Sequence, residues 1–237
     1  MHDDINETRR ISARWGAFLA FSVAFLCLFT FFFAFQAIPV VGSYCIADCV
    51  AYPFTEIGLR YPIDFMWMYP ALVLVVNTAL LFLMLLMSVD ACKRLPAAVS
   101  FFFVAASSLV LFGAYFVQVT VLPAQLLLGR TEGLVVFSQY DEYGAFIALE
   151  DAGYLLLAFG MGLLWAIFRK GDQLEKWIAL IGAFCLFATL AALAFYSFAY
   201  GLLRGYRFEV AAISINWLGL VLVGVLLGLW FRRQTIS

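Results

Sequence analysis

Two adjacent acidic residues, Glu150 and Asp151, lie inside a long apolar stretch of the sequence that runs from about 145 to 168. A helix rises about 1.5 Å per residue, so Glu150 is expected on the order of 10 Å from the nearer end of that stretch. An unpaired carboxylate is costly at such a depth in a membrane, and it must face protein or water, pair, or take up a proton. These acids are therefore candidates for proton transfer or for binding a polar group.

The two acids cannot share one partner easily. Adjacent helical residues point about 100° apart around the helix axis. Glu150 therefore continues a stripe with Tyr154, whereas Asp151 continues the neighbouring stripe with Leu155. Each carboxyl group is expected to need its own partner.

Candidate partners occur mainly near the outer ends of the later apolar stretches, and they supply hydroxyl, amide, carboxyl and guanidinium groups at a matching depth. The candidates are Gln118, Tyr196, Tyr200, Arg204, Arg207, Glu209 and Asn216, with Asp64 and Asn77 in an earlier stretch. Their number exceeds what one salt bridge requires. With Glu150, Asp151 and Tyr154, they predict an outward-facing vestibule between the fourth, fifth and sixth spans that binds a small or amphiphilic molecule.

A purely structural alternative carries nearly equal weight. Glu150 or Asp151 could form a salt bridge with Arg204 or Arg207 that only locks the fourth, fifth and sixth spans together. Amide side chains could bond between helices in the same way. The run of aromatic residues Phe29, Phe31, Phe32, Phe33 and Phe35 is interpreted as lipid-facing or packing surface rather than as a ligand site.

The elements that position these residues follow from composition. Hydrophobic residues make up 66% of the chain and charged residues 12%, and the mean hydropathy is +1.01, which excludes a water-soluble fold. A helix needs about 20 apolar residues to cross a bilayer. The sequence therefore predicts an all-α membrane protein, a bundle of six transmembrane helices forming one domain over residues 1–237. The predicted spans are about 15–41, 65–89, 96–122, 145–168, 178–201 and 210–231.

Basic residues predict the orientation, because short loops rich in lysine and arginine stay on the cytoplasmic side. Of the 14 basic residues, ten fall on the side of the two termini and four on the other side. The N and C termini are thus predicted to be cytoplasmic, in a multi-pass protein of the cell membrane whose compact loops favour a prokaryotic inner membrane. The connections at about 42–64 and 123–144 are expected to cap the outer end of the bundle.

Several kinds of chemistry lack their usual residues. The single histidine, His2, lies in a polar N-terminal segment expected to be an irregular tail, so a catalytic triad, a haem ligand and a histidine metal site are not predicted. Glycine-rich nucleotide loops and basic patches with interleaved aromatic residues are also absent from the sequence, and no cofactor and no nucleic-acid partner are predicted. Cys45 and Cys49 have C-x3-C spacing, which suits a structural disulfide or two idle thiols better than a redox pair.

The segments IALEDAGYLLLAF (147–159) and FYSFAYGLLRGYRFEVAAISINW (195–217) resemble uncharacterised six-span membrane proteins of prokaryotes that are grouped as a domain of unknown function. The resemblance covers roughly the second half of the chain. It is carried by Glu150 and Asp151 and by the segment from Tyr206 to Glu209. It implies a six-span fold and no particular activity.

Two classes of function follow. In the first, Glu150 or Asp151 holds a transferable proton and Arg207 orients an anionic group of an amphiphilic ligand, for carriage, sensing or acid–base chemistry. In the second, the protein is a non-catalytic accessory or assembly subunit of a larger membrane complex. Membrane lipids, a small amphiphilic ligand and a membrane-protein partner are the corresponding partners, and whether the protein is an enzyme is left open.

Overall fold

The computed structural model describes residues 2–36, 41–46, 49–51, 54, 60–130, 133 and 135–236, with backbone only for 2–10 and 236. Within these residues the structure is helical and contains no strand. The α-helices are α1 (His2–Ala34), α2 (Met68–Ser88), α3 (Arg94–Leu127), α4 (Ala145–Gly162), α5 (Leu164–Phe168), α6 (Gln173–Tyr200) and α7 (Tyr206–Ile236). Short 3-10 helices are η1 (Gly42–Tyr44), η3 (Ile63–Phe65), η4 (Ala91–Lys93), η5 (Val135–Phe137) and η6 (Gly201–Arg204).

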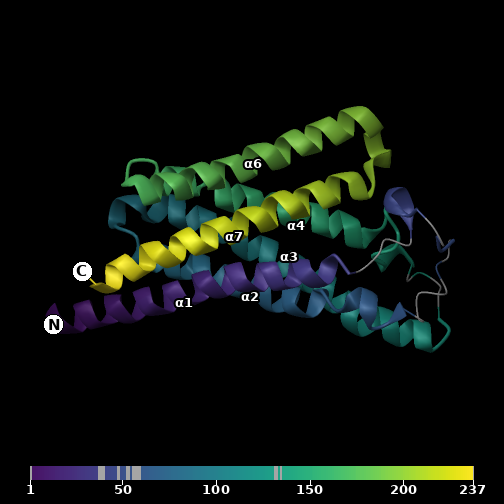
Figure 1. The fold of residues 1–237 in the computed structure, drawn as a ribbon, viewed down its shortest axis with the longest axis horizontal. Coiled ribbons are helices and arrows are strands. Elements are labelled where there is room, and N and C mark those ends of the chain that lie inside the picture. The colour runs from purple at the N-terminus through teal and green to yellow at the C-terminus, as the bar shows by residue number, and fades with distance from the viewer. Residues whose placement is uncertain are drawn as a thin grey trace.

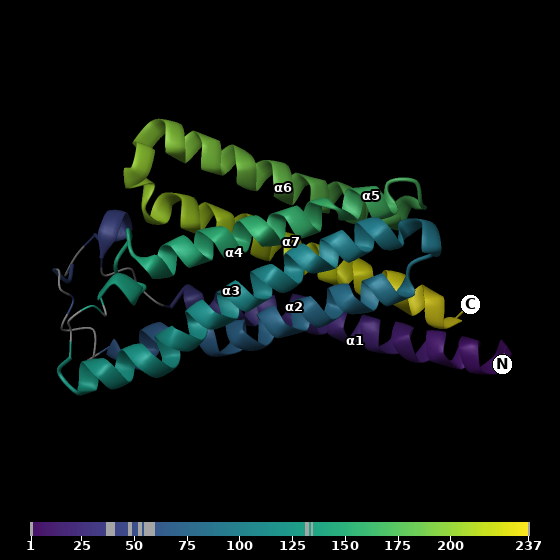
Figure 2. The same cartoon turned by 180° about the vertical axis from the view of Figure 1, so that it is seen from behind.

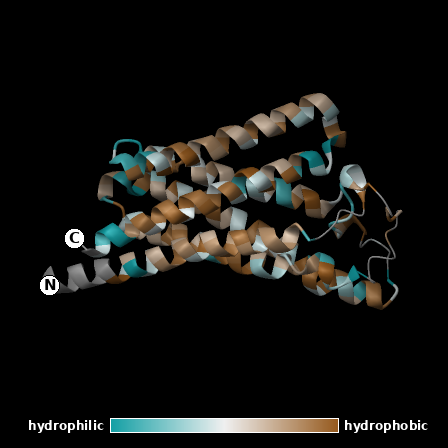
Figure 3. Ribbon diagram, viewed as in Figure 1, coloured by the Kyte–Doolittle hydropathy of each residue, from teal (hydrophilic) through white to brown (hydrophobic). Residues whose placement is uncertain are grey.

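In the described part of the chain, six helical segments are long and apolar enough to cross a membrane, which confirms the predicted all-α architecture with six such helices. The helices run side by side along the length of the molecule (Figures 1 and 2). Hydrophobic residues dominate their middle parts, and hydrophilic residues gather toward the two ends of the bundle (Figure 3). This distribution suits a multi-pass membrane protein in contact with lipid.

Some helix ends differ from the predicted spans. The first span was predicted to reach 41, but α1 ends at Ala34, since hydropathy does not register a helix-disfavouring residue such as Pro39. The N-terminal segment, predicted as an irregular tail, belongs to α1 from His2 onward. The fourth span is divided at Leu163 into α4 and α5. Helix α3 is longer than predicted and continues through Pro123 to Leu127.

Both termini lie at one end of the bundle, together with the α2–α3 and α5–α6 connections (Figures 1 and 2). We call this the terminal end. The opposite end, called the distal end, contains the described residues of the connections between α1 and α2 and between α3 and α4, together with the turn at 201–205. A disulfide between Cys45 and Cys49 lies in the first of these connections, next to η1.

Helix packing uses small residues at close contacts. On α3, the hydroxyl groups of Ser100 and Ser107 donate hydrogen bonds of 2.6 and 2.7 Å to the carbonyl oxygens of Gly160 and Gly153 on α4. These contacts bring the two helix backbones close together, as is common in membrane bundles. Helix α1 packs against α7 and α2, and α6 packs against α7 and α4. Helices α1 and α7 are therefore direct neighbours in the bundle, although they are the first and last spans of the sequence.

Candidate functional site

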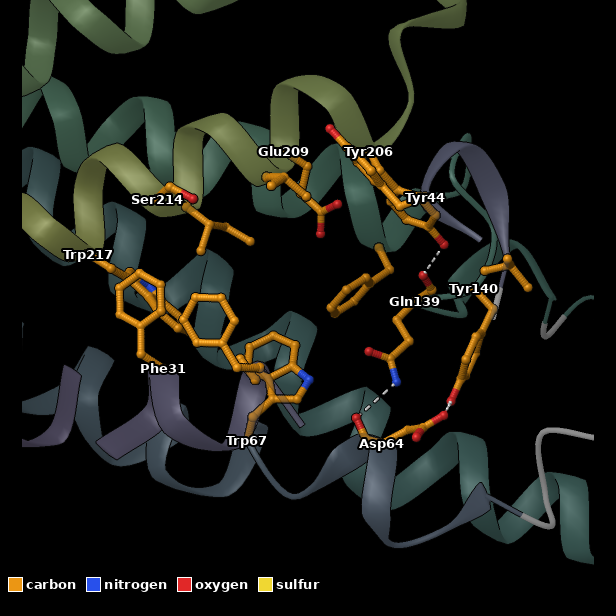
Figure 4. Close-up of a pocket in the computed structure, with 16 residues that line it drawn as sticks. Phe31, Tyr44, Asp64, Trp67, Gln139, Tyr140, Tyr206, Glu209, Ser214 and Trp217 are labelled. Atoms are coloured by element: carbon orange, nitrogen blue, oxygen red, sulfur yellow. Dashed lines mark hydrogen bonds between the residues drawn. The ribbon is translucent and has the colours of Figure 1, made fainter. Parts of the chain in front are cut away.

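A cavity of about 390 Å³ lies at the distal end, between α1, the start of α2 and α7, and we call it the distal cavity. Its wall also includes Phe146 of α4 and residues of the connections at 41–44 and 139–140. Eight of the 16 lining residues are aromatic (Figure 4). This size and this predominantly apolar lining are typical of sites for small ligands.

The deepest aromatic part of the wall is built around Trp217 of α7. Its ring meets Phe31 of α1 edge to face, with 4.8 Å between ring centroids, and lies 6.1 Å from the ring of Trp67. The indole Nε1 of Trp217 donates a 2.9 Å hydrogen bond to the hydroxyl oxygen of Tyr154 behind the wall. That bond fixes the orientation of the indole, so the aromatic wall is held rigidly by neighbouring helices.

Asp64 lines the cavity but has its charge balanced. Arg60 donates two hydrogen bonds to its carboxylate, at 2.5 and 3.1 Å, and the Tyr140 hydroxyl donates a third at 2.6 Å. The bond to Asp64 raises the pKa of Arg60, and burial together with the same carboxylate raises the pKa of Tyr140. Both donors therefore keep their protons near neutral pH. This cluster holds the 135–144 connection against the entrance of α2.

Gln139 and Tyr206 extend this connection to α7. The hydroxyl group of Tyr206 donates a 2.6 Å hydrogen bond to the backbone oxygen of Gln139, whose amide reaches the backbone oxygen of Asp64 at 3.5 Å (Figure 4). Gly42 of η1 has φ +68°, a conformation that favours glycine. Its Cα lies so close to the Tyr206 ring that a Cβ atom at this position would be only 2.6 Å from a ring carbon. Glycine is thus required for η1 to rest on α7.

Glu209 is the acidic group of the cavity that has no counter-ion among the residues the structure describes. Its side chain extends from the first turns of α7 toward the cavity (Figure 4), and only 8% of the residue surface is exposed. The ion pairs among the described residues are formed by Asp64, Asp151, Asp172 and Glu175, and none of them includes Glu209. The group that interacts most closely with its carboxyl is another acid, Glu150. A buried acidic pair of this kind is electrostatically costly unless a proton or another cation lies between the groups.

Glu150 belongs to a polar network behind the cavity wall. It is fully buried, and its Oε1 accepts a 2.8 Å hydrogen bond from the hydroxyl group of Tyr115. The hydroxyl groups of Tyr115 and Tyr154 are 2.7 Å apart, and Tyr154 accepts the hydrogen bond from Trp217. Within the described part of the chain, Oε2 of Glu150 has no hydrogen-bond partner. The network therefore joins the acidic pair to the aromatic wall.

Asp151 has a different role. Its Oδ2 lies 3.3 Å from Nη2 of Arg204, and the Arg204 guanidinium group also lies over the ring of Phe208, 5.5 Å from the centroid. The salt bridge connects α4 to the turn between α6 and α7. It is the locking bridge that the sequence offered as the structural alternative, and it involves Asp151 but not Glu150.

The remaining predicted site residues lie outside the distal cavity. Tyr196 and Tyr200 are stacked on α6, and the Arg207 guanidinium group lies 4.4 Å from the centroid of the Tyr200 ring. Asn216 donates to Oγ1 of Thr189 at 3.2 Å and so joins α7 to α6. Gln118 donates to the backbone oxygen of Phe137 and accepts from the backbone N–H of Gln139 at 3.1 Å.

Of the ten residues predicted for a vestibule between the fourth, fifth and sixth spans, only Glu209 lines the distal cavity, which lies chiefly between the first, second and sixth spans. Sequence reasoning missed the aromatic wall. Phe31 and Phe35 were assigned to lipid-facing or packing surface, yet both line the cavity. Their i,i+4 spacing puts them on one helix face, but it cannot show that this face meets Trp217.

Searches against protein-family models, characterised proteins and solved structures find no match for the chain. The resemblance to uncharacterised six-span proteins therefore stays a prediction. Among the described residues, no group of three or more histidine, cysteine or acidic side chains could hold a metal ion. The chemistry of the site must be inferred from the distal cavity itself.

Proposed function

We propose that the protein binds an amphiphilic molecule in the distal cavity, for carriage or sensing at one face of a membrane. The observation that carries this proposal is an aromatic cavity of about 390 Å³ inside a bundle of apolar helices, with one lining acid that has no counter-ion in the described part of the chain. The aromatic wall suits an apolar chain or ring, while Glu209 and Ser214 suit a polar head group. Acid–base catalysis has less support, because the Glu150 side chain is buried behind the wall.

Filling the cavity should abolish this binding. Ser214→Trp places an indole in the distal cavity, and the amount of amphiphile that stays bound to the purified protein should fall at least about tenfold. Leu218→Trp, one turn along α7 at a site that is 58% exposed, is the matched control and should retain wild-type binding. Native mass spectrometry of protein extracted in mild detergent measures both. Equal retention by the two variants would contradict the proposal.

We also propose that the terminal end faces the cytoplasm of a prokaryotic cell and that the distal cavity faces outward. The excess of basic residues at the terminal end supports this orientation. The Cys45–Cys49 disulfide at the distal end supports it independently, because disulfides persist in oxidising compartments outside the cytoplasm.

A thiol-labelling experiment tests the orientation. Cys92 is the exposed free cysteine, whereas Cys27 and Cys185 are buried. A membrane-impermeant maleimide should label Cys92 only after the cells are permeabilised. The control is Arg130→Cys in a Cys92→Ser background, which places a thiol in the 128–144 connection and should be labelled in intact cells. The reverse pattern would show that the distal cavity faces the cytoplasm.

A further inference from the structure

We infer that the distal cavity selects amphiphiles whose head group carries a positively charged nitrogen, which Glu209 binds as counter-ion beside the aromatic wall. This inference rests on the proposed function and names its class of ligand. The evidence comes from the charges around the cavity, from the pairing of Glu209 with Glu150, and from the kind of side chain that forms the wall.

The charged groups that line the cavity are acidic. The cavity lining includes two acids, Asp64 and Glu209, and no lysine or arginine among the described residues. Each nearby arginine has another partner, because Arg60 binds Asp64 and Arg204 binds Asp151. The guanidinium group of Arg207 lies over the Tyr200 ring. An anionic head group, as expected from the sequence for Arg207, would therefore meet Glu209 and no basic side chain in the described lining.

The acidic pair provides the second argument. Glu209 and Glu150 interact with each other and lie near Asp151, so three acids of α4 and α7 occur with one arginine, Arg204. Glu150 is fully buried and accepts a hydrogen bond from Tyr115, while its Oε2 lacks a hydrogen-bond partner among the described residues. A ligand cation beside Glu209 would take the place of the proton that otherwise relieves the repulsion between these two acids. A neutral head group could not do so.

The aromatic wall provides the third argument. Aromatic rings attract cations through the negative potential of their faces, and cages of such rings bind quaternary ammonium groups in other proteins. In the distal cavity, the Trp217 ring packs against the rings of Phe31 and Trp67, and Tyr206 and Tyr44 lie near Glu209 (Figure 4). A carboxylate with surrounding aromatic side chains is the combination that suits an alkylammonium head, with its alkyl chain along the apolar wall.

Three probes with the same twelve-carbon chain test the inference: dodecyltrimethylammonium, dodecyl sulfate and an uncharged dodecyl ether of ethylene glycol. Binding of each probe to the purified full-length protein is titrated by native mass spectrometry. The ammonium probe should bind at least about tenfold more tightly than the other two. In Glu209→Gln, this preference should disappear while binding of the uncharged probe changes little. Glu142→Gln alters a distal acid outside the cavity lining and should keep the preference.

A second pair of variants keeps the test decisive if Glu209→Gln folds poorly. Ile213 lines the cavity one helical turn after Glu209, so Ile213→Lys supplies a built-in cation at i,i+4 spacing and should remove the preference for the ammonium probe. Ile213→Met changes the shape but adds no charge, and it should retain the preference.

The outcomes separate this inference from the proposed function. Equal binding of the three probes, lost in Ser214→Trp, would overturn the cation preference and leave amphiphile binding intact. A preference for the ammonium probe that persists in both Glu209→Gln and Ile213→Lys would also overturn the role of Glu209. If no probe binds in a way that Ser214→Trp removes, both the proposed function and the inference fail.

Discussion

Replacing Gly182 of α6 by leucine is expected to destabilise the bundle by about 3 kcal/mol, the upper end of the usual range for overpacked cores. A Cβ atom at this position would overlap the backbone oxygen of Met161 on α4 and lie 3.1 Å from Cβ of Leu164. Because backbone atoms cannot move aside as a side chain can, α6 must separate from α4. The melting temperature should fall by about 6–12 °C for a chain of this length.

The chain offers a matched control for this substitution. Gly113 of α3 is exposed, and a Cβ atom there would meet no atom within 4 Å. Gly113→Leu should therefore leave the melting temperature in detergent close to that of the wild type. Similar losses in the two variants would mean that leucine acts through the helix backbone or the detergent rather than through the α4–α6 interface.

Arg204→Gln is expected to cost about 2 kcal/mol, because it leaves the carboxylate of Asp151 without its cation inside the bundle. The Asp151 side chain is 11% exposed, whereas that of Arg204 is 30% exposed. The value is therefore set below the usual cost of breaking a fully buried pair, since solvent screens part of the interaction. The melting temperature should fall by about 4–8 °C.

Two further variants identify the cause of that loss. Asp151→Asn added to Arg204→Gln removes the unpaired charge and should recover part of the stability. Glu150→Gln keeps an acceptor for the hydroxyl group of Tyr115 and should leave the melting temperature near that of the wild type. A large loss in Glu150→Gln would mean that this carboxyl group holds the helices together and would weaken the case for a ligand beside Glu209.

The spans were predictable from hydropathy, but their ends were less so. An apolar window indicates that a segment can cross a membrane, because each span must bury about 20 residues in hydrocarbon. It does not report local backbone geometry. For that reason the window of the first span overran the end of α1 at Ala34, and the window of the fourth span did not reveal the division at Leu163.

The two adjacent acids illustrate how far sequence reasoning reached into the site. Their place in an apolar stretch predicted burial and a need for partners, and the structure buries both. Their different helical directions predicted separate partners, and Asp151 and Glu150 do have separate ones. The sequence did not identify Tyr115 as a partner of Glu150, because it does not show which face of α3 packs against α4.

The sequence by itself determined a membrane-embedded bundle of six helices with acidic groups buried toward one end, because hydropathy and the cost of burying charge act on each segment separately. Only the tertiary structure decided which helices are neighbours. It brought Phe31 and Trp217 from the first and last spans into one aromatic wall and placed Glu209 in the lining of the same cavity. The physical reason is that neighbours are selected by complementary side-chain packing between helix faces, and the helical repeat of one span carries no record of the face it meets.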